Sequence, residues 1–231
     1  MTCTHQEYDE VVGNPIPITG TTHRSFFFGA TEVSSIRKLL PTHLSHQPTS
    51  FDLVTVCLWR CRTKALQADP QDDVRLMFLA NARIGRDRFK PPLPKGYYGN
   101  AIVFRQRFRR SENSESLLEY ALELVRESKD VVNGEYFHSV ADFLVTRGRP
   151  SFATVRSFIV ADFSCLGFKD VDFGWGKAVY AGPAFSGLGT LQGSTFYVGY
   201  SNSKGEEGRI VPVCLPPECM EKFAKEFGSY A

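Results

Sequence analysis

The order of apolar patterns along the chain is the feature that most constrains its fold. Short, nearly continuous apolar runs, such as Val74–Ala82, alternate with longer segments in which apolar residues recur with a helical period. A continuous run of this length suits a strand that is covered on both faces. Strands interleaved with helices predict one α/β domain, with a mixed β-sheet and helices packed against it.

The clearest helical pattern begins near Ser50. Its apolar residues follow the i, i+3, i+4, i+7 rule, which predicts a helix lying on a core: Val54, Cys57, Leu58, Cys61 and Ala65. The other expected strands are His23–Gly29, an aromatic run suited to a buried strand, Ala101–Phe104, the alternating segment Ala153–Phe163, and a hairpin of Ser194–Tyr200 with Gly208–Cys214. Further helices are expected after Thr31, through Leu117, over Glu135–Leu144 and from Pro217.

Charge and hydropathy narrow the classes of partner. The formal net charge of +2 is too small for the basic surface that nucleic-acid binding needs. The longest apolar runs fall well short of the roughly 20 residues that cross a bilayer, and the first ten residues carry no apolar secretory signal. We therefore expect a cytoplasmic protein with neither nucleic acid nor membrane as a partner.

The cysteine pattern favours a reducing compartment. None of the six cysteines forms a CxxC pair, and Cys57 and Cys61 sit one helical turn apart inside the apolar stripe. Buried free thiols explain this pattern better than a metal site, which would need two more ligands nearby.

Three short motifs, in a fixed order, carry a resemblance to a known family. Residues 81–83 read NAR, residues 93–100 read LPKGYYGN, and the third motif reads DFGWG: Asp172, Phe173, Gly174, Trp175 and Gly176. Together they resemble the NxR, LPxGYFGN and DFGWG elements of the plant BAHD acyltransferases, which transfer an acyl group from coenzyme A to an alcohol or amine. The segments HRSFFFG, FDLVTVCLWRCRTKAL, HSVADFLVTRGRP and VPVCLPPECMEKFAKEF resemble the ester-forming members, including benzyl alcohol benzoyltransferase-like ones.

The resemblance implies that this chain is half of a larger architecture. Family members consist of two similar, chloramphenicol acetyltransferase-like domains with the active site in a channel between them. On this basis residues 21–231 form the C-terminal domain, and residues 1–20 form a connector from an N-terminal domain outside the chain. The full-length protein is expected to be a monomer.

The position of the catalytic base follows from the same resemblance. In the family the base is the His of an HxxxD motif in the first domain. This chain spells HxxxD at His138–Asp142, but there the sequence predicts a helix, on whose surface the two residues can pair one turn apart. We therefore expect no catalytic base in this chain.

For DFGWG the resemblance implies a structural role. Asp172 is expected to pair with Arg83 of the NxR element, since a carboxylate and a guanidinium can form a bidentate, geometry-fixing pair. Gly174 and Gly176 would let the backbone turn closely around Trp175. Trp175 is also a candidate for positioning the oxyanion or shaping the channel; the alternative is a tryptophan packed in the core.

Candidate substrate contacts lie elsewhere. Asp162 and Ser164 fall where family members present acceptor-pocket residues, although an Asp at a strand end is equally often a turn former. Acyl-CoA is expected as co-substrate, with no bound cofactor or metal. Its phosphates favour Lys, Arg and helix N-terminal amides, which points to Thr49, Ser50 and Lys95, the last in a basic loop over residues 86–95. A solvated basic loop without a ligand is the alternative.

The expected function is that of an acyl-CoA-dependent O-acyltransferase, forming esters from small, volatile or benzyl-type alcohols. The chain would be its C-terminal half, without the catalytic HxxxD and inactive in isolation. Two alternatives stay open. One is a truncated, non-catalytic paralogue that acts as a binding or interaction domain, and the other is assembly with a separately encoded first half.

Overall fold

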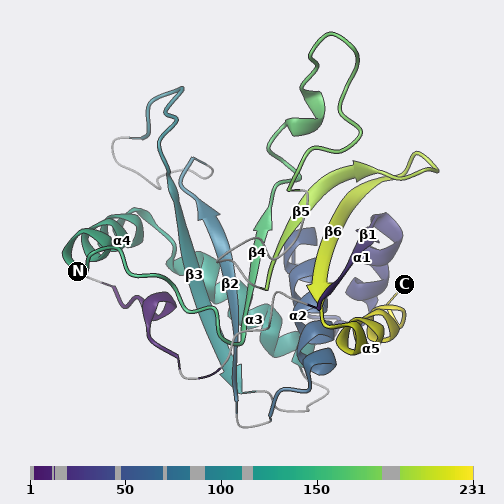
Figure 1. The fold of residues 1–231 in the computed structure, drawn as a ribbon, viewed down its shortest axis with the longest axis horizontal. Helices are drawn as coiled ribbons and strands as arrows, with labels where there is room; N and C mark the ends of the chain where they lie inside the picture. Colours follow the sequence, from purple (N-terminus) through teal and green to yellow (C-terminus); the bar gives the residue numbers. More distant parts are fainter. Residues whose placement is uncertain are drawn as a thin grey trace.

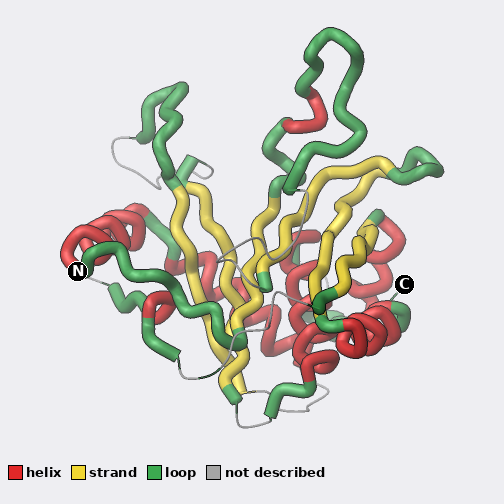
Figure 2. The backbone as a smooth tube through the Cα atoms, in the orientation of Figure 1, coloured by secondary structure: helices red, strands yellow, loops and turns green. Residues whose placement is uncertain are grey.

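A six-stranded mixed β-sheet organises the computed structural model, which describes residues 3–11, 13, 20–44, 48–69, 72–83, 92–110, 117–183 and 193–230 (Figures 1 and 2). The strands are β1 (Thr22–Phe28), β2 (Asp73–Asn81), β3 (Ile102–Arg110), β4 (Ser157–Asp162), β5 (Ser194–Ser201) and β6 (Glu207–Leu215). Their order across the sheet is β1-β6-β5-β4-β2-β3. The central strands β2, β4 and β5 run parallel, and the outer pairs are antiparallel. The predicted α/β fold with a mixed sheet is therefore confirmed.

The helices form two groups. They are α1 (Ala30–Lys38), α2 (Ser50–Leu66), α3 (Leu117–Val131), α4 (Gly134–Thr146) and α5 (Pro217–Phe227). Helix α2 contacts α1, α3 and α5, and all four share one apolar core with the sheet. Helix α4 packs apart from them, against β3 and a smaller cluster that includes Val103 and Phe137. In Figure 1, α4 lies at the opposite side of the molecule from α5.

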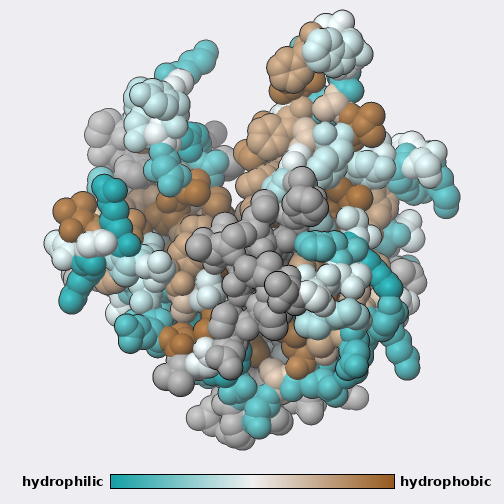
Figure 3. Space-filling view, viewed as in Figure 1, coloured by the Kyte–Doolittle hydropathy of each residue, from teal (hydrophilic) through white to brown (hydrophobic). Residues whose placement is uncertain are grey.

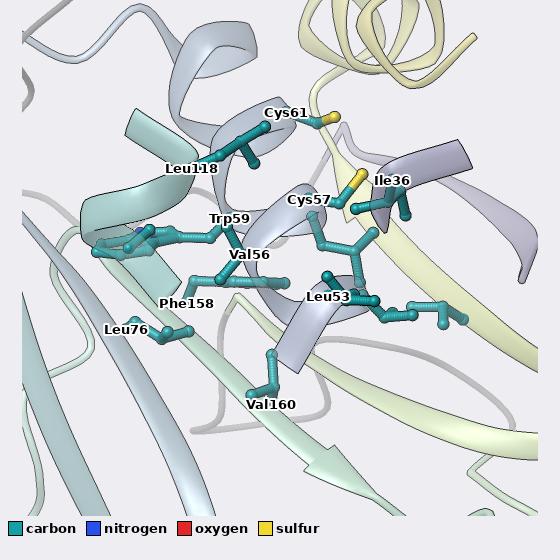
Figure 4. Packing of buried hydrophobic residues seen from close by; sticks show 14 of the residues in the cluster. Ile36, Leu53, Val56, Cys57, Trp59, Cys61, Leu76, Leu118, Phe158 and Val160 are labelled. Atoms are coloured by element: carbon teal, nitrogen blue, oxygen red, sulfur yellow. The ribbon is translucent and has the colours of Figure 1, made fainter. Parts of the chain in front are cut away.

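Helix α2 is the centre of the main core, as its periodicity predicts. Its first turn is closed by a capping box, in which the Asp52 N–H donates to the Thr49 hydroxyl and the Thr49 N–H donates to the Asp52 carboxylate. Figure 4 shows its side chains, such as Val56, between Leu118 of α3 and Ile36 of α1.

The two cysteines of this helix are structural, as predicted. Both Cys57 and Cys61 are 0% exposed and neither is in a disulfide. The adjacent thiol of Cys57, together with burial, raises the pKa of Cys61 well above its ordinary value. Both thiols therefore pack as small apolar groups.

Two strands differ from their predicted environment. Strand β1 was expected to be buried by its aromatic run, but it is an edge strand that pairs with β6, and His23, Arg24 and Ser25 are exposed. Strand β4 was expected to alternate, but every residue from Ser157 to Ala161 is buried. The reason is position, because β4 lies between β2 and β5 in the middle of the sheet.

The described part of the predicted connector is packed into the domain. A 3-10 turn over Gln6–Tyr8 lies against β3, and its Glu7 side chain is fully buried. The Tyr136 hydroxyl of α4 donates to Glu7 Oε1 at 2.5 Å, and His5 Nδ1 lies 3.1 Å from the same oxygen. His5 Nε2 lies 2.8 Å from Ser139 Oγ. We call His5, Glu7, Tyr136 and Ser139 the N-terminal network.

Candidate functional site

A charged cluster lies where β4 ends and β6 begins. Arg209 Nε donates to Asp162 Oδ2 at 3.3 Å and to Ser164 Oγ at 3.2 Å. Ser164 in turn donates to Asp162 Oδ1 from its backbone N–H at 2.9 Å and from its hydroxyl at 2.5 Å. The three side chains, which we call the Arg209 cluster, are therefore mutually fixed. They stand at the carboxyl end of a central parallel strand, where α/β folds commonly bind ligands.

Arg209 also lines a cavity of about 410 Å³ beside this cluster. The cavity lies between the start of β6, the start of α1 and the start of α2, and its lining includes Gly29, Ser34, Arg37, Ser50 and Gly208. Arg37 and Arg209 supply positive charge to this space, and the first residues of α1 and α2 line it. Glu207 also lines it, and its pKa is held below the ordinary value by a hydrogen bond from Ser201 and the charge of Lys169.

The structure shows one of the two roles that the sequence left open for Asp162, and contact of Asp162 and Ser164 with the alcohol stays a prediction. The Ser164 N–H bond to Asp162 forms the turn expected of an Asp at a strand end. The second carboxylate oxygen of Asp162 binds Arg209, which brings the pair to the edge of the cavity. Sequence reasoning missed Arg209 and Arg37, because no local motif marks them and only the folded sheet brings them to Asp162 and Ser50.

The predicted coenzyme A residues do not form one site. Ser50 lines the cavity, whereas the Thr49 hydroxyl caps α2 and donates to Asp52 at 2.7 Å. Lys95 is exposed in residues 92–101, which lead into β3 at the opposite edge of the sheet from β1 and β6. Four strand spacings, roughly 19 Å, separate β3 from β6. Lys95 therefore lies apart from Thr49 and Ser50, its contact with coenzyme A stays a prediction, and the rest of the basic loop, residues 86–91, lies outside the described residues.

The DFGWG motif forms the tip of a projecting loop, residues 163–183, which we call the DFGWG loop (Figure 1). Asp172 Oδ1 accepts hydrogen bonds from the N–H groups of Gly174 at 2.8 Å and Gly176 at 3.0 Å. An antiparallel bridge joins Asp172 to Lys177. Both glycines adopt positive φ, +99° and +116°, as the close turn requires. The predicted use of the glycines is confirmed.

The predicted pair between Asp172 and Arg83 is not formed. Arg83 donates to the carbonyl oxygens of Tyr97 and Gly99, and its guanidinium lies 5.8 Å from the centre of the Tyr97 ring. No ion pair joins Arg83 to Asp172, both of which lie in the described part of the chain. Each side chain makes its hydrogen bonds locally instead. Asp172 accepts from the backbone of the DFGWG turn, and Arg83 donates to the backbone of residues 97–99.

The aromatic side chains of the motif point away from the protein. Trp175 is 87% exposed and Phe173 is 76% exposed, and the two rings lie 6.2 Å apart. The reading of Trp175 as a packed core residue is therefore wrong for this chain. A role for Trp175 in positioning an oxyanion or shaping a channel stays a prediction.

Neither HxxxD sequence has the setting of a catalytic base. His138 and Asp142 lie on α4, as predicted, with both residues exposed. A second HxxxD, at His5–Asp9, was missed by sequence reasoning, and its histidine is buried with both ring nitrogens bound within the N-terminal network. A base must reach the proton it removes. His5 therefore has a structural role.

The described residues contain neither a clustered metal site nor a helix suited to crossing a membrane. They contain no cluster of three His, Cys, Asp or Glu side chains arranged to hold a metal ion. No helix among them combines the length and the hydropathy that crossing a membrane requires.

Comparison with known proteins decides the family. The family model described as "Transferase family" matches residues 4–229. A benzyl alcohol O-benzoyltransferase from Petunia hybrida is 50% identical over 99% of this chain and 50% of its own length. The chain belongs to the BAHD acyltransferase family. The resemblance carried by DFGWG, NAR and LPKGYYGN is thereby confirmed.

Two other relatives also match nearly the whole of this chain and about half of their own length. A second benzyl alcohol O-benzoyltransferase, from Nicotiana tabacum, is 50% identical over 98% of this chain and 49% of its own length. An alcohol acyl transferase from Malus domestica is 43% identical over 98% of this chain and 50% of its own length. This BAHD chain thus spans about half the length of the relatives it matches.

Solved structures agree on the fold. Vinorine synthase superimposes with a TM-score of 0.69 at 17% identity, over 94% of this chain and 49% of its own. TRI101 of F. graminearum, complexed with coenzyme A and deoxynivalenol, gives a TM-score of 0.71 at 17% identity, over 95% and 50%. At this identity the likeness shows the fold alone. The BAHD chain therefore has one half of the acyltransferase architecture.

Proposed function

We propose that this chain is the C-terminal half of an acyl-CoA-dependent alcohol O-acyltransferase, which forms esters from small or benzyl-type alcohols. The observation that carries the proposal is the 50% identity with two benzyl alcohol O-benzoyltransferases over 98–99% of the chain. Residues 21–231 would form the domain, and the described N-terminal residues would join it to the other half. We place the full-length protein in the cytoplasm, which its six free cysteines support, and we assign it a monomeric state on the resemblance alone.

The contribution that we assign to this half is binding of acyl-CoA. Coenzyme A carries several phosphates, and the cavity beside the Arg209 cluster presents Arg37, Arg209 and the N-terminus of α2 at Ser50. Arginine suits phosphate because its planar fork can donate two parallel hydrogen bonds. Thr49 would act through the helix cap, and Asp162 and Ser164 would hold Arg209 in place beside the alcohol pocket.

Acyl transfer also needs a base to take the alcohol proton and a donor to stabilise the oxyanion. In this proposal the base comes from the half of the fold that the chain does not span, which follows from the exposed position of His138 and the engaged nitrogens of His5. No metal takes part. The isolated chain is therefore expected to bind acyl-CoA without turning it over.

Binding of coenzyme A to the purified chain tests this assignment by isothermal titration. Arg209→Gln and Arg37→Gln should each weaken binding about tenfold or more, since a charge-assisted hydrogen bond contributes about 1.5–3 kcal/mol. Arg24→Gln is the matched control, because Arg24 lies on β1 and pairs with Glu221 outside the cavity. Equal affinities for all three variants, with unchanged melting curves, would contradict the assigned cavity.

A turnover assay separates the proposal from a non-catalytic binding domain. That second candidate is favoured by the exposed position of His138 and by the absence of a histidine from the described residues that line the cavity. The chain should be assayed with acetyl-CoA or benzoyl-CoA and small alcohols, alone and together with the complementary half of the Petunia enzyme. Ester formation only in the mixture supports the acyltransferase. Turnover by the chain alone that is lost in His138→Ala would show that the base is in this half.

A further inference from the structure

Charges of both signs line the cavity beside the Arg209 cluster. Figure 3 shows hydrophilic residues, in teal and white, over the tip of the β5–β6 hairpin, next to which Glu207 and Arg209 line the cavity. The carboxylate of Glu207 repels an anion, and Arg209 is already paired with Asp162. The position of Arg37, the other arginine in the lining, therefore matters for any phosphate that binds there.

Arg37 is held by the segment that leads into α2. Its Nη2 atom donates to the carbonyl oxygen of Pro48 at 3.1 Å. Pro48 is buried, and Ser50, two residues further along, lines the same cavity. The position of the Arg37 guanidinium in the cavity therefore depends on the backbone path of residues 48–50.

That path is fixed in turn by Asp52. Its Oδ2 atom accepts from the Thr49 N–H group at 2.9 Å and from the Thr49 hydroxyl at 2.7 Å. One carboxylate oxygen thus holds both the backbone and the side chain of the residue that follows Pro48. The Asp52 side chain is only 4% exposed, and a buried carboxylate is costly unless a cation pairs with it.

Lys129, in the last turn of α3, supplies this cation. Its ammonium group donates to Asp52 Oδ1, the oxygen that Thr49 leaves unused. The same ammonium lies 4.6 Å from the centre of the Phe51 ring, which is the geometry of a cation–π contact. Lys129 is therefore fixed between a carboxylate and an aromatic ring at the start of α2. No residue of α3 is among the described residues that line the cavity.

We propose that Lys129 is a positioning residue for coenzyme A, which acts from outside the cavity. Lys129 holds Asp52, and Asp52 holds Thr49. The carbonyl group of Pro48, joined to Thr49 by one peptide bond, holds Arg37 against the cavity, where its guanidinium binds a phosphate. The inference rests on the proposed function, because it takes this cavity as the coenzyme A site, and it adds the residue that keeps Arg37 in place.

Isothermal titration of the purified chain with coenzyme A tests the role of Lys129. Lys129→Met removes the charge at similar length and should weaken binding about fivefold, whereas Lys129→Arg keeps the ion pair and should stay within about twofold of the wild-type affinity. Lys64→Met is the matched control, because Lys64 lies in the last turn of α2 and pairs with Glu226 outside the cavity. It should leave the affinity unchanged. Melting curves verify that each variant is folded at the temperature of the titration.

A double-mutant cycle separates positioning of Arg37 from a general loss of stability. Because Lys129 acts through Arg37, adding Lys129→Met to Arg37→Gln should weaken binding by less than about a further twofold. Adding it to Arg24→Gln, which leaves the cavity intact, should cost the full, about fivefold, loss. A destabilised fold would instead weaken binding equally in both backgrounds.

The results distinguish this inference from the proposal on which it rests. Wild-type affinity in Lys129→Met, or equal losses in the Arg37→Gln and Arg24→Gln backgrounds, would overturn the role of Lys129 and leave the cavity as the coenzyme A site. No binding of coenzyme A by the wild-type chain, or binding that neither Arg37→Gln nor Arg209→Gln weakens, would overturn the cavity assignment and this inference together.

Discussion

The N-terminal network and the DFGWG loop place their side chains in opposite environments. The first has the polar sequence THQEYD, yet Glu7 is 0% exposed and His5 is bound on both ring nitrogens. The second has the apolar sequence FGWG, yet Trp175 is 87% exposed. Polarity alone would predict the reverse for each.

The two regions differ in the contacts that the folded chain supplies. A buried carboxylate is costly unless hydrogen-bonded, and Glu7 Oε1 has two partners from the folded chain, Tyr136 and His5, whereas the buried Glu7 Oε2 has no hydrogen-bond partner among the described residues. An exposed indole gains nothing from its position in the free chain, so its burial requires another surface. The N-terminal network therefore stabilises this half, whereas the exposed side chains of the DFGWG loop contribute little to the stability of the free chain.

Removing the carboxylate of Glu7 should have the largest effect on stability. Glu7→Ala leaves Tyr136 and His5 without their shared acceptor inside the fold, which should lower the free energy of unfolding by about 2–4 kcal/mol. Urea denaturation gives the value. Glu10→Ala is the control, because Glu10 is exposed, and it should change stability by less than about 0.5 kcal/mol. Equal effects of the two variants would show that the network does not stabilise the fold.

Tyr136→Phe should have a smaller effect that depends on pH. At neutral pH the loss of the hydroxyl should cost about 1–2 kcal/mol, because Glu7 loses its donor. Burial, and then the charge of Glu7, raises the pKa of Tyr136 well above its usual value of 10.0. The folded state therefore keeps a proton that the unfolded chain releases above pH 10, and stability falls as pH rises beyond that value.

Tyr8 contributes in the same direction, since burial raises its pKa to about 12. In Tyr136→Phe the decline of stability above pH 10 should be shallower by up to about 1.4 kcal/mol per pH unit. Urea denaturation at pH 8, 10 and 11 measures this slope. A slope identical to that of the wild-type chain would contradict the buried, neutral state assigned to Tyr136.

Substitution of Trp175 should have the smallest effect on the free chain. Because its indole is exposed, Trp175→Ser should change the free energy of unfolding by less than about 0.5 kcal/mol. Thermal and urea unfolding measure this change. A loss above about 2 kcal/mol would mean that the indole is packed within this chain, and the contrast with the N-terminal network would disappear.

The sequence predicts those parts of the fold that local patterns determine. The helical period of apolar residues over 50–66 identifies α2, and the continuous apolar run near Val74 identifies β2. In both elements the local pattern of apolar residues determines which side chains are buried. The burial of β4 and the exposure of β1 depend instead on their places in the sheet. No periodicity within a strand specifies whether it becomes an edge strand.

In the candidate site, too, the sequence predicts local features but not contacts between distant residues. DFGWG is visible as a motif, and its glycines adopt the positive φ that their type allows. The motif alone does not reveal the partner of Asp172, because the backbone N–H groups of Gly174 and Gly176 in the same loop donate to its carboxylate. No sequence motif marks Arg209 or Glu7 as a functional or structural residue. Arg209 binds Asp162, 47 positions away, and Glu7 accepts from Tyr136, 129 positions away.

Amide hydrogen exchange of the free chain tests the central claim most directly. We predict protection at Tyr8 and Asp9, whose N–H groups are bonded in the N-terminal turn, and rapid exchange at residues 178–182, which belong to no helix or strand. Rapid exchange at Tyr8 and Asp9, or protection of residues 178–182, would contradict the account.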